Sequence, residues 1–248
     1  MIKFIEKPNL PDGKVKSLIC GGLNSKIIDF LKEKDIDIYF TEKNLKVDSA
    51  VSSHCDIEAF YLGSGRIILD RFQVELSENL SKKGFDILFT ENEVQGKYPG
   101  DIILNNAIIG EFFIGNTKFS DRSVTDNIKN KNILHVNQGY ARCSVLPVNE
   151  SSLITDDESI YRICCKNDLD CLLVGKGDVS LDGHDYGFIG GAGGKISDDE
   201  MLFFGDITKH RNYIEILDFL NERNIRMIYF DFPLYDFGGF IPLEEWNK

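Results

Sequence analysis

The sequence predicts a single α/β domain of five repeated ββαβ units, whose ring is closed by the two ends of the chain. Two observations lead to this prediction. The same order of apolar runs and amphipathic helix recurs along the chain, and an orphan apolar run near the C terminus matches the strand that the first unit lacks. A length of 248 residues exceeds the usual size of one domain, but a symmetric ring accommodates it as one domain over residues 1–248.

The repeat is clearest in the unit that follows residue 55. Predicted strands cover 56–62 and 66–69, because both runs are apolar and a Gly-Ser-Gly turn separates them. Leu76 and Leu80 lie one helical turn apart, which indicates an amphipathic helix. A third apolar run over 85–89 completes the ββαβ order.

Three further units have the same order with different turns. Their predicted hairpins pair 101–104 with 108–114 around Asn105-Asn106, 143–148 with 153–154, and 187–191 with 201–204 around Gly193-Gly194. An amphipathic helix and a final apolar run follow each hairpin. These final runs begin near Ile133, Leu172 and Ile228.

The two ends of the chain supply the remaining unit. Residues 15–20 read as a strand, Asn24 or Ser25 as a helix cap, and 36–40 as a second strand. The missing first strand matches the run at 238–243. We therefore expect 239–243 to pair with 15–20, because both ends would otherwise leave exposed strand edges.

Composition excludes several classes of function. Forty acidic residues against 28 basic ones give a net charge of −12, which disfavours direct nucleic-acid binding. No stretch approaches the roughly 20 apolar residues of a membrane helix, and residues 1–6 lack a secretion signal, so we expect a cytoplasmic protein without membrane contact. The six cysteines have no C-x-x-C spacing, so we expect reduced thiols, no metal and no cofactor. The oligomeric state is left open.

Two pairs of segments carry a resemblance to a known superfamily. Residues 98–104 (YPGDIIL) and 110–115 (GEFFIG) resemble a hairpin and strand of dimethylarginine dimethylaminohydrolases. With its five ββαβ units, the chain resembles the pentein superfamily of guanidino-group-modifying proteins, which implies a five-bladed α/β propeller. Residues 187–191 (GFIGG) and 236–239 (DFGG) further resemble a bacterial family of unknown function within that superfamily.

The catalytic pattern that the resemblance implies is incomplete here. In pentein enzymes, acidic side chains of early units bind the guanidinium, a histidine of the third unit shuttles protons, and a cysteine of the last unit attacks. Residues 140–144 (YARCS) contain no histidine, and no cysteine follows Cys171. We therefore expect no arginine deiminase or dimethylaminohydrolase chemistry by the usual route.

Pseudo-fivefold symmetry would aim the start of each unit's first strand at one axial mouth. Carboxylates gathered there suit a planar cation, because guanidinium and carboxylate form bidentate hydrogen bonds. Cys143 follows a cation, whose charge would lower the pKa of the thiol and make it a relocated nucleophile, with a histidine as proton shuttle. The candidates are Cys143, His184 and His54 for catalysis, and Asp56, Asp101, Asp185, Asp236 and Arg142 for substrate binding. Alternation along a strand would turn Cys55 away from that mouth.

Three classes of function follow from this pattern. The first is a protein that binds a small guanidino- or amidino-type cation, or a divergent hydrolase or transferase that acts on one. The second is a catalytically silent pentein that acts through its surface, as the ribosome anti-association factor of this fold does. The third, an ordinary metabolic α/β domain, applies only if the repeat count is wrong.

Overall fold

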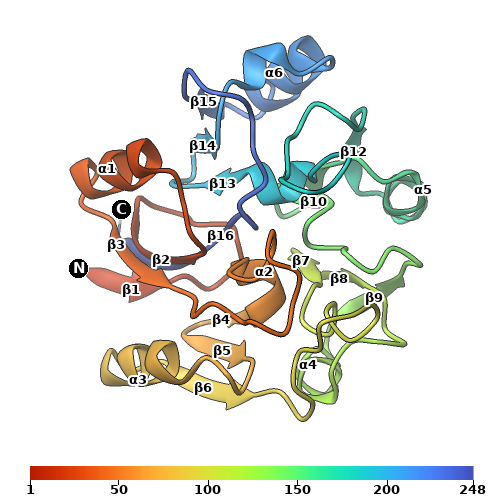
Figure 1. Cartoon of the computed structure of the whole chain (residues 1–248). Coiled ribbons are helices and arrows are strands. Elements are labelled where there is room, and N and C mark those ends of the chain that lie inside the picture. The colour runs from red at the N-terminus through yellow and green to blue at the C-terminus, as the bar shows by residue number, and fades with distance from the viewer. Residues whose placement is uncertain (248) are drawn as a thin grey trace.

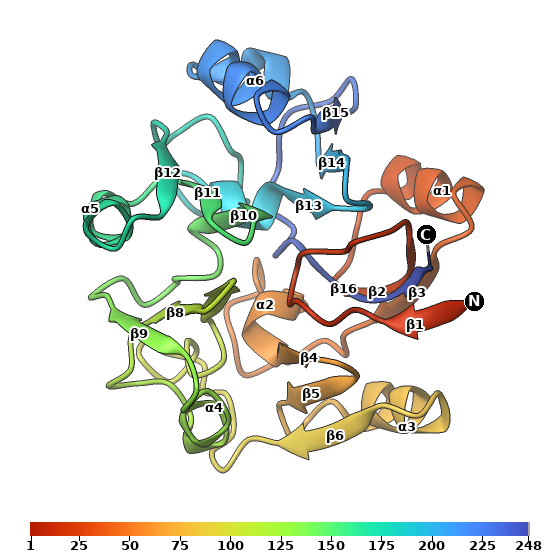
Figure 2. The same cartoon turned by 180° about the vertical axis from the view of Figure 1, so that it is seen from behind.

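The computed structural model describes residues 1–247, which form a mixed α/β fold with five small sheets. In Figure 1 the sheets stand around a common centre, with α1, α3, α4, α5 and α6 on the outside. The view from behind in Figure 2 has the same arrangement. Among the described residues, no helix is long and apolar enough to cross a membrane.

The first sheet contains both ends of the chain. Its strand order is β1-β16-β2-β3, formed by Ile2–Phe4, Phe240–Trp246, Val15–Cys20 and Asp37–Phe40, and helix α1 (Ser25–Glu33) connects β2 to β3. Strand β16 pairs antiparallel with β2, and Phe240 lies opposite Cys20. The predicted pairing between the two ends of the chain is therefore confirmed.

The other four sheets repeat one pattern of three strands. In each, the middle strand pairs antiparallel with the strand before it and parallel with the strand after it. A parallel pair needs a crossover, which a helix provides. The elements are β4 (Ala59–Gly63), β5 (Arg66–Leu69), α3 (Val74–Lys82) and β6 (Asp86–Phe89); β7 (Ala107–Ile109), β8 (Phe112–Gly115), α4 (Arg122–Asn127) and β9 (Asn132–His135); β10 (Val145–Asn149), β11 (Ser152–Thr155), α5 (Glu158–Lys166) and β12 (Asp170–Leu173); and β13 (Gly193–Lys195), β14 (Glu200–Phe203), α6 (Tyr213–Asn221) and β15 (Arg226–Ile228).

A short polar side chain starts the crossover in several units. Asn24 accepts a hydrogen bond from the backbone N–H of Lys26 at the start of α1. Asp121 and Asp157 cap α4 and α5 in the same way. Such caps satisfy N–H groups that have no partner within a helix, so they fix where each of these helices begins.

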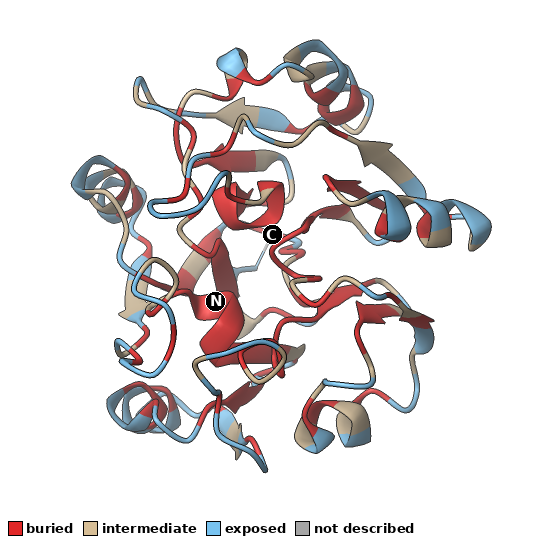
Figure 3. Cartoon of the chain, turned by 45° about the vertical axis from the view of Figure 1, so that its right-hand side comes forward, coloured by how far each residue is buried: buried red, intermediate tan, exposed pale blue. Residues whose placement is uncertain are grey.

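The core lies between the sheets and the inner faces of the helices. Figure 3 shows buried residues concentrated at the centre and exposed residues on the outer helices. Ile27 and Leu31 of α1 are buried, as are Leu76 and Leu80 of α3. This spacing of four residues places one apolar face of each helix on its sheet.

The starts of three units differ from the prediction. Residues Cys55–Glu58 form a helical turn, α2, so the strand alternation assigned to Cys55 and its neighbours is wrong. Residues 101–104 are turns, and 187–192 run through a loop into a short 3-10 turn. The predicted hairpin turns at Asn105-Asn106 and Gly193-Gly194 are therefore also wrong. These segments precede the strands, and local hydrogen bonds such as Asn105 N–H to the Ile102 carbonyl satisfy their backbone.

Candidate functional site

A cavity of about 340 Å³ opens where the segments that precede β4, β7, β10, β13 and β16 converge. In Figure 1 these elements and α2 surround the centre of the molecule. Six of the eight candidate side chains line the cavity: His54, Asp101, Cys143, His184, Asp185 and Asp236. The cavity has the size of a small-molecule site. The roles of these residues remain predictions.

Cys143 and Asp56 form a buried pair at the cavity wall. The Cys143 thiol donates a hydrogen bond to Oδ2 of Asp56 across 2.9 Å. Asn105 holds the pair in place: its Nδ2 donates to Cys143 Sγ at 3.0 Å and to the Asp56 carbonyl at 3.1 Å. Asp56 therefore lies behind Cys143 and does not line the cavity itself.

The electrostatic surroundings of Cys143 differ from the prediction. Burial raises the pKa of the thiol well above its usual range, and the negative charges of Asp56 and Asp236 raise it further. Burial also raises the pKa of Asp56. The expectation that Arg142 lowers the pKa of Cys143 is therefore wrong, and the thiol is held in its neutral form.

Arg142 holds backbone segments together behind the cavity. Its guanidinium donates to the carbonyl oxygens of Val145 at 3.0 Å and Gly190 at 3.1 Å, and lies 3.4 Å from the Phe240 carbonyl. These carbonyls belong to three different sheets or the segments before them. The guanidinium is turned away from the cavity, so the geometry gives no support to Arg142 as a substrate-binding residue.

Asp101 presents a carboxylate with one unused oxygen. Its Oδ2 accepts a hydrogen bond from the Tyr140 hydroxyl at 2.6 Å, while Oδ1 is buried and has no hydrogen-bond partner. The side chain is only 7% exposed. A buried acceptor without a partner is costly, so a donor that entered the cavity would find a ready site.

His54 and Asp236 form a second polar pair. His54 Nδ1 lies 3.8 Å from Asp236 Oδ1, beyond hydrogen-bond distance, and has no other partner. The two oxygens of Asp236 accept backbone N–H groups of Gly238 and Phe188, both at 2.9 Å. Gly238 has φ of +78°, and a Cβ atom there would lie 2.5 Å from that of His54. The glycine therefore permits both the turn and the close approach.

Two exposed loops carry the remaining polar lining. His184 Nε2 lies 3.7 Å from Asp48 Oδ1, so the loop after Leu181 meets the loop after Val47. Asp185, on the same loop as His184, is exposed. The cavity thus has buried polar groups inside and exposed ones at its rim.

Sequence reasoning missed five polar or aromatic residues of this arrangement. Tyr140, Tyr186 and Phe188 supply aromatic walls, Asp48 lies at the rim, and Asn105 orders Cys143. Tyr140 is three residues before Cys143 in the segment already singled out, so its position was the available signal. The contacts of the Asn105 amide were not predicted, because the sequence placed Asn105 in a hairpin turn.

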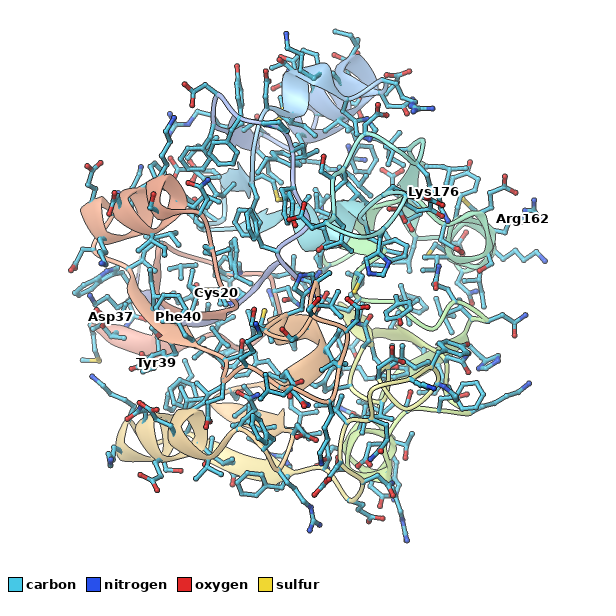
Figure 4. All side chains as sticks on the ribbon, in the orientation of Figure 1. Cys20, Asp37, Tyr39, Phe40, Arg162 and Lys176 are labelled. Carbon is cyan, nitrogen blue, oxygen red and sulfur yellow. The ribbon has the colours of Figure 1, made fainter. Side chains whose placement is uncertain are left out.

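A second, wider groove lies beside α5 and contains Asp156, Lys176 and Arg162. Figure 4 shows Lys176 and Arg162 on the side of the molecule where α5 and β12 lie. Oδ1 of Asp156 is buried without a hydrogen-bond partner, and burial raises the pKa of this carboxyl to about 7. All residues that line the groove except Asn212 belong to one unit of the fold, so the groove lacks the convergence of the central cavity.

Within residues 1–247 no group of three or more His, Cys, Asp or Glu side chains is arranged to hold a metal ion. All six cysteines are free; Cys165 is exposed and Cys171 half-buried, while Cys20, Cys55, Cys143 and Cys164 are buried.

The fold is that of the guanidino-modifying pentein proteins. The inosamine-phosphate amidinotransferase StrB1 of Streptomyces griseus superposes with a TM-score of 0.61 at 8% identity, covering 99% of this chain and 98% of that one. SxtG, an amidinotransferase of Microseira wollei, gives 0.58 at 8% identity over 92% of both chains. Agmatine deiminase of C. jejuni gives 0.54 at 11% identity, over 93% and 91%. The predicted pentein resemblance is confirmed at the level of the fold.

The chain belongs to the family of unknown function DUF6873, whose model matches residues 18–241. This match is consistent with the predicted resemblance to a pentein branch of unknown function. The sequence matches none of the curated proteins compared with it.

Proposed function

We propose that this protein is a single-domain pentein whose five sheets are the blades of an α/β propeller, and that its central cavity binds a small guanidinium- or amidinium-type cation. The observation that carries the proposal is the unpartnered Oδ1 of Asp101, buried in a cavity lined by further carboxylates. A guanidinium N–H fork would satisfy this oxygen, and a charge-assisted hydrogen bond of this kind is worth roughly 1.5 to 3 kcal/mol.

The remaining lining supports a planar cation. Tyr140 and Phe188 stack with ring centroids 6.0 Å apart and an interplanar angle of 28°, and both rings line the cavity. Aromatic faces attract guanidinium groups through their quadrupoles. Negative charge from Asp236 adds to that of Asp101.

A divergent hydrolase or transferase is the second candidate, and the Cys143–Asp56 pair is the observation that favours it. Attack by Cys143 would require the neutral thiol to pass its proton to Asp56, whose raised pKa suits a base. His54 or His184 would then donate a proton to the leaving group. A neutral, hydrogen-bonded thiol makes binding without turnover the better-supported function.

The surface-acting scaffold has less support. A protein that acts only through its surface has no need for buried polar atoms without partners at a central cavity, whereas His54 Nδ1 and Asp101 Oδ1 are both of this kind. We therefore place the scaffold function after the binding function.

Thermal unfolding with methylguanidine tests the proposal. Methylguanidine should raise the melting temperature by the equivalent of about 2.7 kcal/mol at a hundredfold excess over Kd. Asp101→Asn should reduce the shift, because a neutral amide replaces the buried carboxylate. Sodium chloride at equal ionic strength and Asp182→Asn, an exposed aspartate outside the cavity lining, are the controls. A shift with sodium chloride equal to that with methylguanidine, or equal methylguanidine shifts for the Asp101→Asn variant and the wild type, would refute the proposal.

A further inference from the structure

The central cavity has two levels of charge. Its interior contains the buried side chains of His54, Asp101 and Asp236, none more than 7% exposed. Its rim contains the exposed side chains of Asp48 and Asp185, on the two loops that meet through His184. A ligand that used both levels would therefore meet negative charge at both of its ends.

An apolar zone lies alongside these charges. Val51, Ile57 and Leu181 line the cavity together with the rings of Tyr140, Tyr186 and Phe188. Tyr186 packs edge-on against Phe188, with centroids 6.1 Å apart. Such a wall suits a hydrocarbon segment, because burial of each methylene group is favourable.

No lysine or arginine of the described chain lines this cavity. The Arg142 guanidinium is engaged by backbone carbonyls behind it. Lys176 lies over the ring of Tyr186 at 5.7 Å and 4.0 Å from Asp157, and it lines the neighbouring groove. A carboxylate on the ligand would therefore find aspartates at both levels and no lysine or arginine side chain in the lining to pair with.

Resting on the proposed function, we propose that the cavity selects an aliphatic organic dication that carries no carboxylate. A guanidinium or amidinium head binds Asp101 and Asp236 in the interior, methylene groups pass the aromatic wall, and a second cationic group binds at Asp48 and Asp185. The same guanidine with an α-carboxylate is excluded by charge repulsion at the rim. The cavity thus distinguishes decarboxylated guanidino compounds from the amino acids that correspond to them.

Isothermal titration calorimetry at constant ionic strength tests this selectivity with three probes that share a guanidinium group on the same alkyl chain. Agmatine has both cations, n-butylguanidine lacks the second cation, and arginine adds a carboxylate. Agmatine should bind at least about tenfold more tightly than arginine, and more tightly than n-butylguanidine, since one further charge pair contributes roughly that factor.

Rim variants separate the two levels. Asp185→Asn should reduce the ratio of the affinity for agmatine to the affinity for n-butylguanidine. The affinity for n-butylguanidine itself should change little. Asp182→Asn is the matched control, because this exposed residue of the same loop does not line the cavity. The Asp182→Asn variant should have the same ratio of affinities for agmatine and n-butylguanidine as the wild type.

The outcomes distinguish this inference from the proposed function. If n-butylguanidine binds but arginine binds as tightly as agmatine, or Asp185→Asn leaves the ratio unchanged, the selectivity inference is overturned and guanidinium binding stands. If none of the three probes binds, both the inference and the proposed function fail.

Discussion

The thiol of Cys143 donates a 2.9 Å hydrogen bond to Oδ2 of Asp56, and both side chains are almost fully buried. Because of this contact Cys143, which the sequence suggested as a nucleophile, is a neutral hydrogen-bond donor. It also fixes the wall of a cavity lined by Asp101, whose Oδ1 has no hydrogen-bond partner; Oδ1 of Asp56 has none either, but Asp56 does not line the cavity. The chemistry of the cavity is therefore better described as binding of a cation than as activation of a thiolate.

Alkylation by iodoacetamide at pH 8 tests the state of this thiol. Cys143 should react at least about tenfold more slowly than the exposed Cys165, because burial and Asp56 both raise the pKa of Cys143. Mass spectrometry of the labelled peptides measures both sites in one sample. Labelling of Cys143 as fast as that of Cys165 would favour the enzyme over the binding protein.

The hydroxyl of Tyr140 should contribute measurably to stability. Tyr140→Phe removes the donor to Asp101 Oδ2 and leaves this buried carboxylate without a partner, which should cost about 1 to 3 kcal/mol in the free energy of unfolding. Tyr98→Phe, in the exposed ring that packs 6.4 Å from Tyr140, should change the free energy by less than about 0.5 kcal/mol. Urea denaturation compares the two. Equal effects would show that the bond to Asp101 contributes nothing.

Asp156 should make stability fall as pH rises. Burial raises the pKa of this carboxyl from 3.8 to about 7, so the folded state favours the protonated form. The contribution of Asp156 to the free energy of unfolding is fully present below pH 4. It is lost as pH rises through 7, by roughly 4 kcal/mol in all. Asp156→Asn should reduce the slope between pH 4 and 7 without abolishing it, because burial also raises the pKa of Glu58 to about 7.

Its neighbour Asp157 provides the control for this pH series. Hydrogen bonds to the start of α5 lower the pKa of Asp157 against the opposing effect of burial. Its contribution is present above pH 4 and is lost only as pH falls further, so Asp157→Asn should change the slope between pH 4 and 7 much less than Asp156→Asn does; the charge of Asp157 has a smaller effect on the pKa of Asp156 than burial has. A wild-type profile that is flat in this window would contradict the raised pKa that burial gives Asp156.

Closure of the first sheet predicts a strong effect of truncation. Removal of residues 237–248 deletes β16, which lies between β1 and β2, so β1 loses its partner strand and β2 becomes an exposed edge. The truncated chain should lose cooperative unfolding, as measured by circular dichroism during heating. Removal of Asn247 and Lys248 alone, beyond β16, should leave a sharp transition. A sharp transition in the longer truncation would refute closure by the chain ends.

The repeated part of the fold was predictable because it follows hydrophobic periodicity. Leu76 and Leu80 marked a helix correctly, and the apolar run over 238–243 identified the strand that joins the two ends. The segments before the first strands were not predictable in the same way. Residues 102–104 are apolar and, with Asp101, read as a strand, but the segment forms turns whose apolar side chains are buried although the segment pairs with no strand.

Part of the membership of the candidate site could be predicted from the sequence, but the contacts of its residues could not. Symmetry alone nominated Asp101, His184 and Asp236 for one cavity, since each precedes the first strand of a unit. The direction of a side chain depends on tertiary packing, so Arg142 could not be seen to face backbone carbonyls. For the same reason the Tyr140 bond to Asp101 has no signature in the sequence.

A crystal structure of the protein with agmatine tests the central claim most directly. The account predicts density for the guanidinium head within about 3 Å of Asp101 Oδ1, inside the cavity lined by Tyr140 and Phe188. An unoccupied cavity at saturating agmatine, or a head group held away from Asp101, would contradict it.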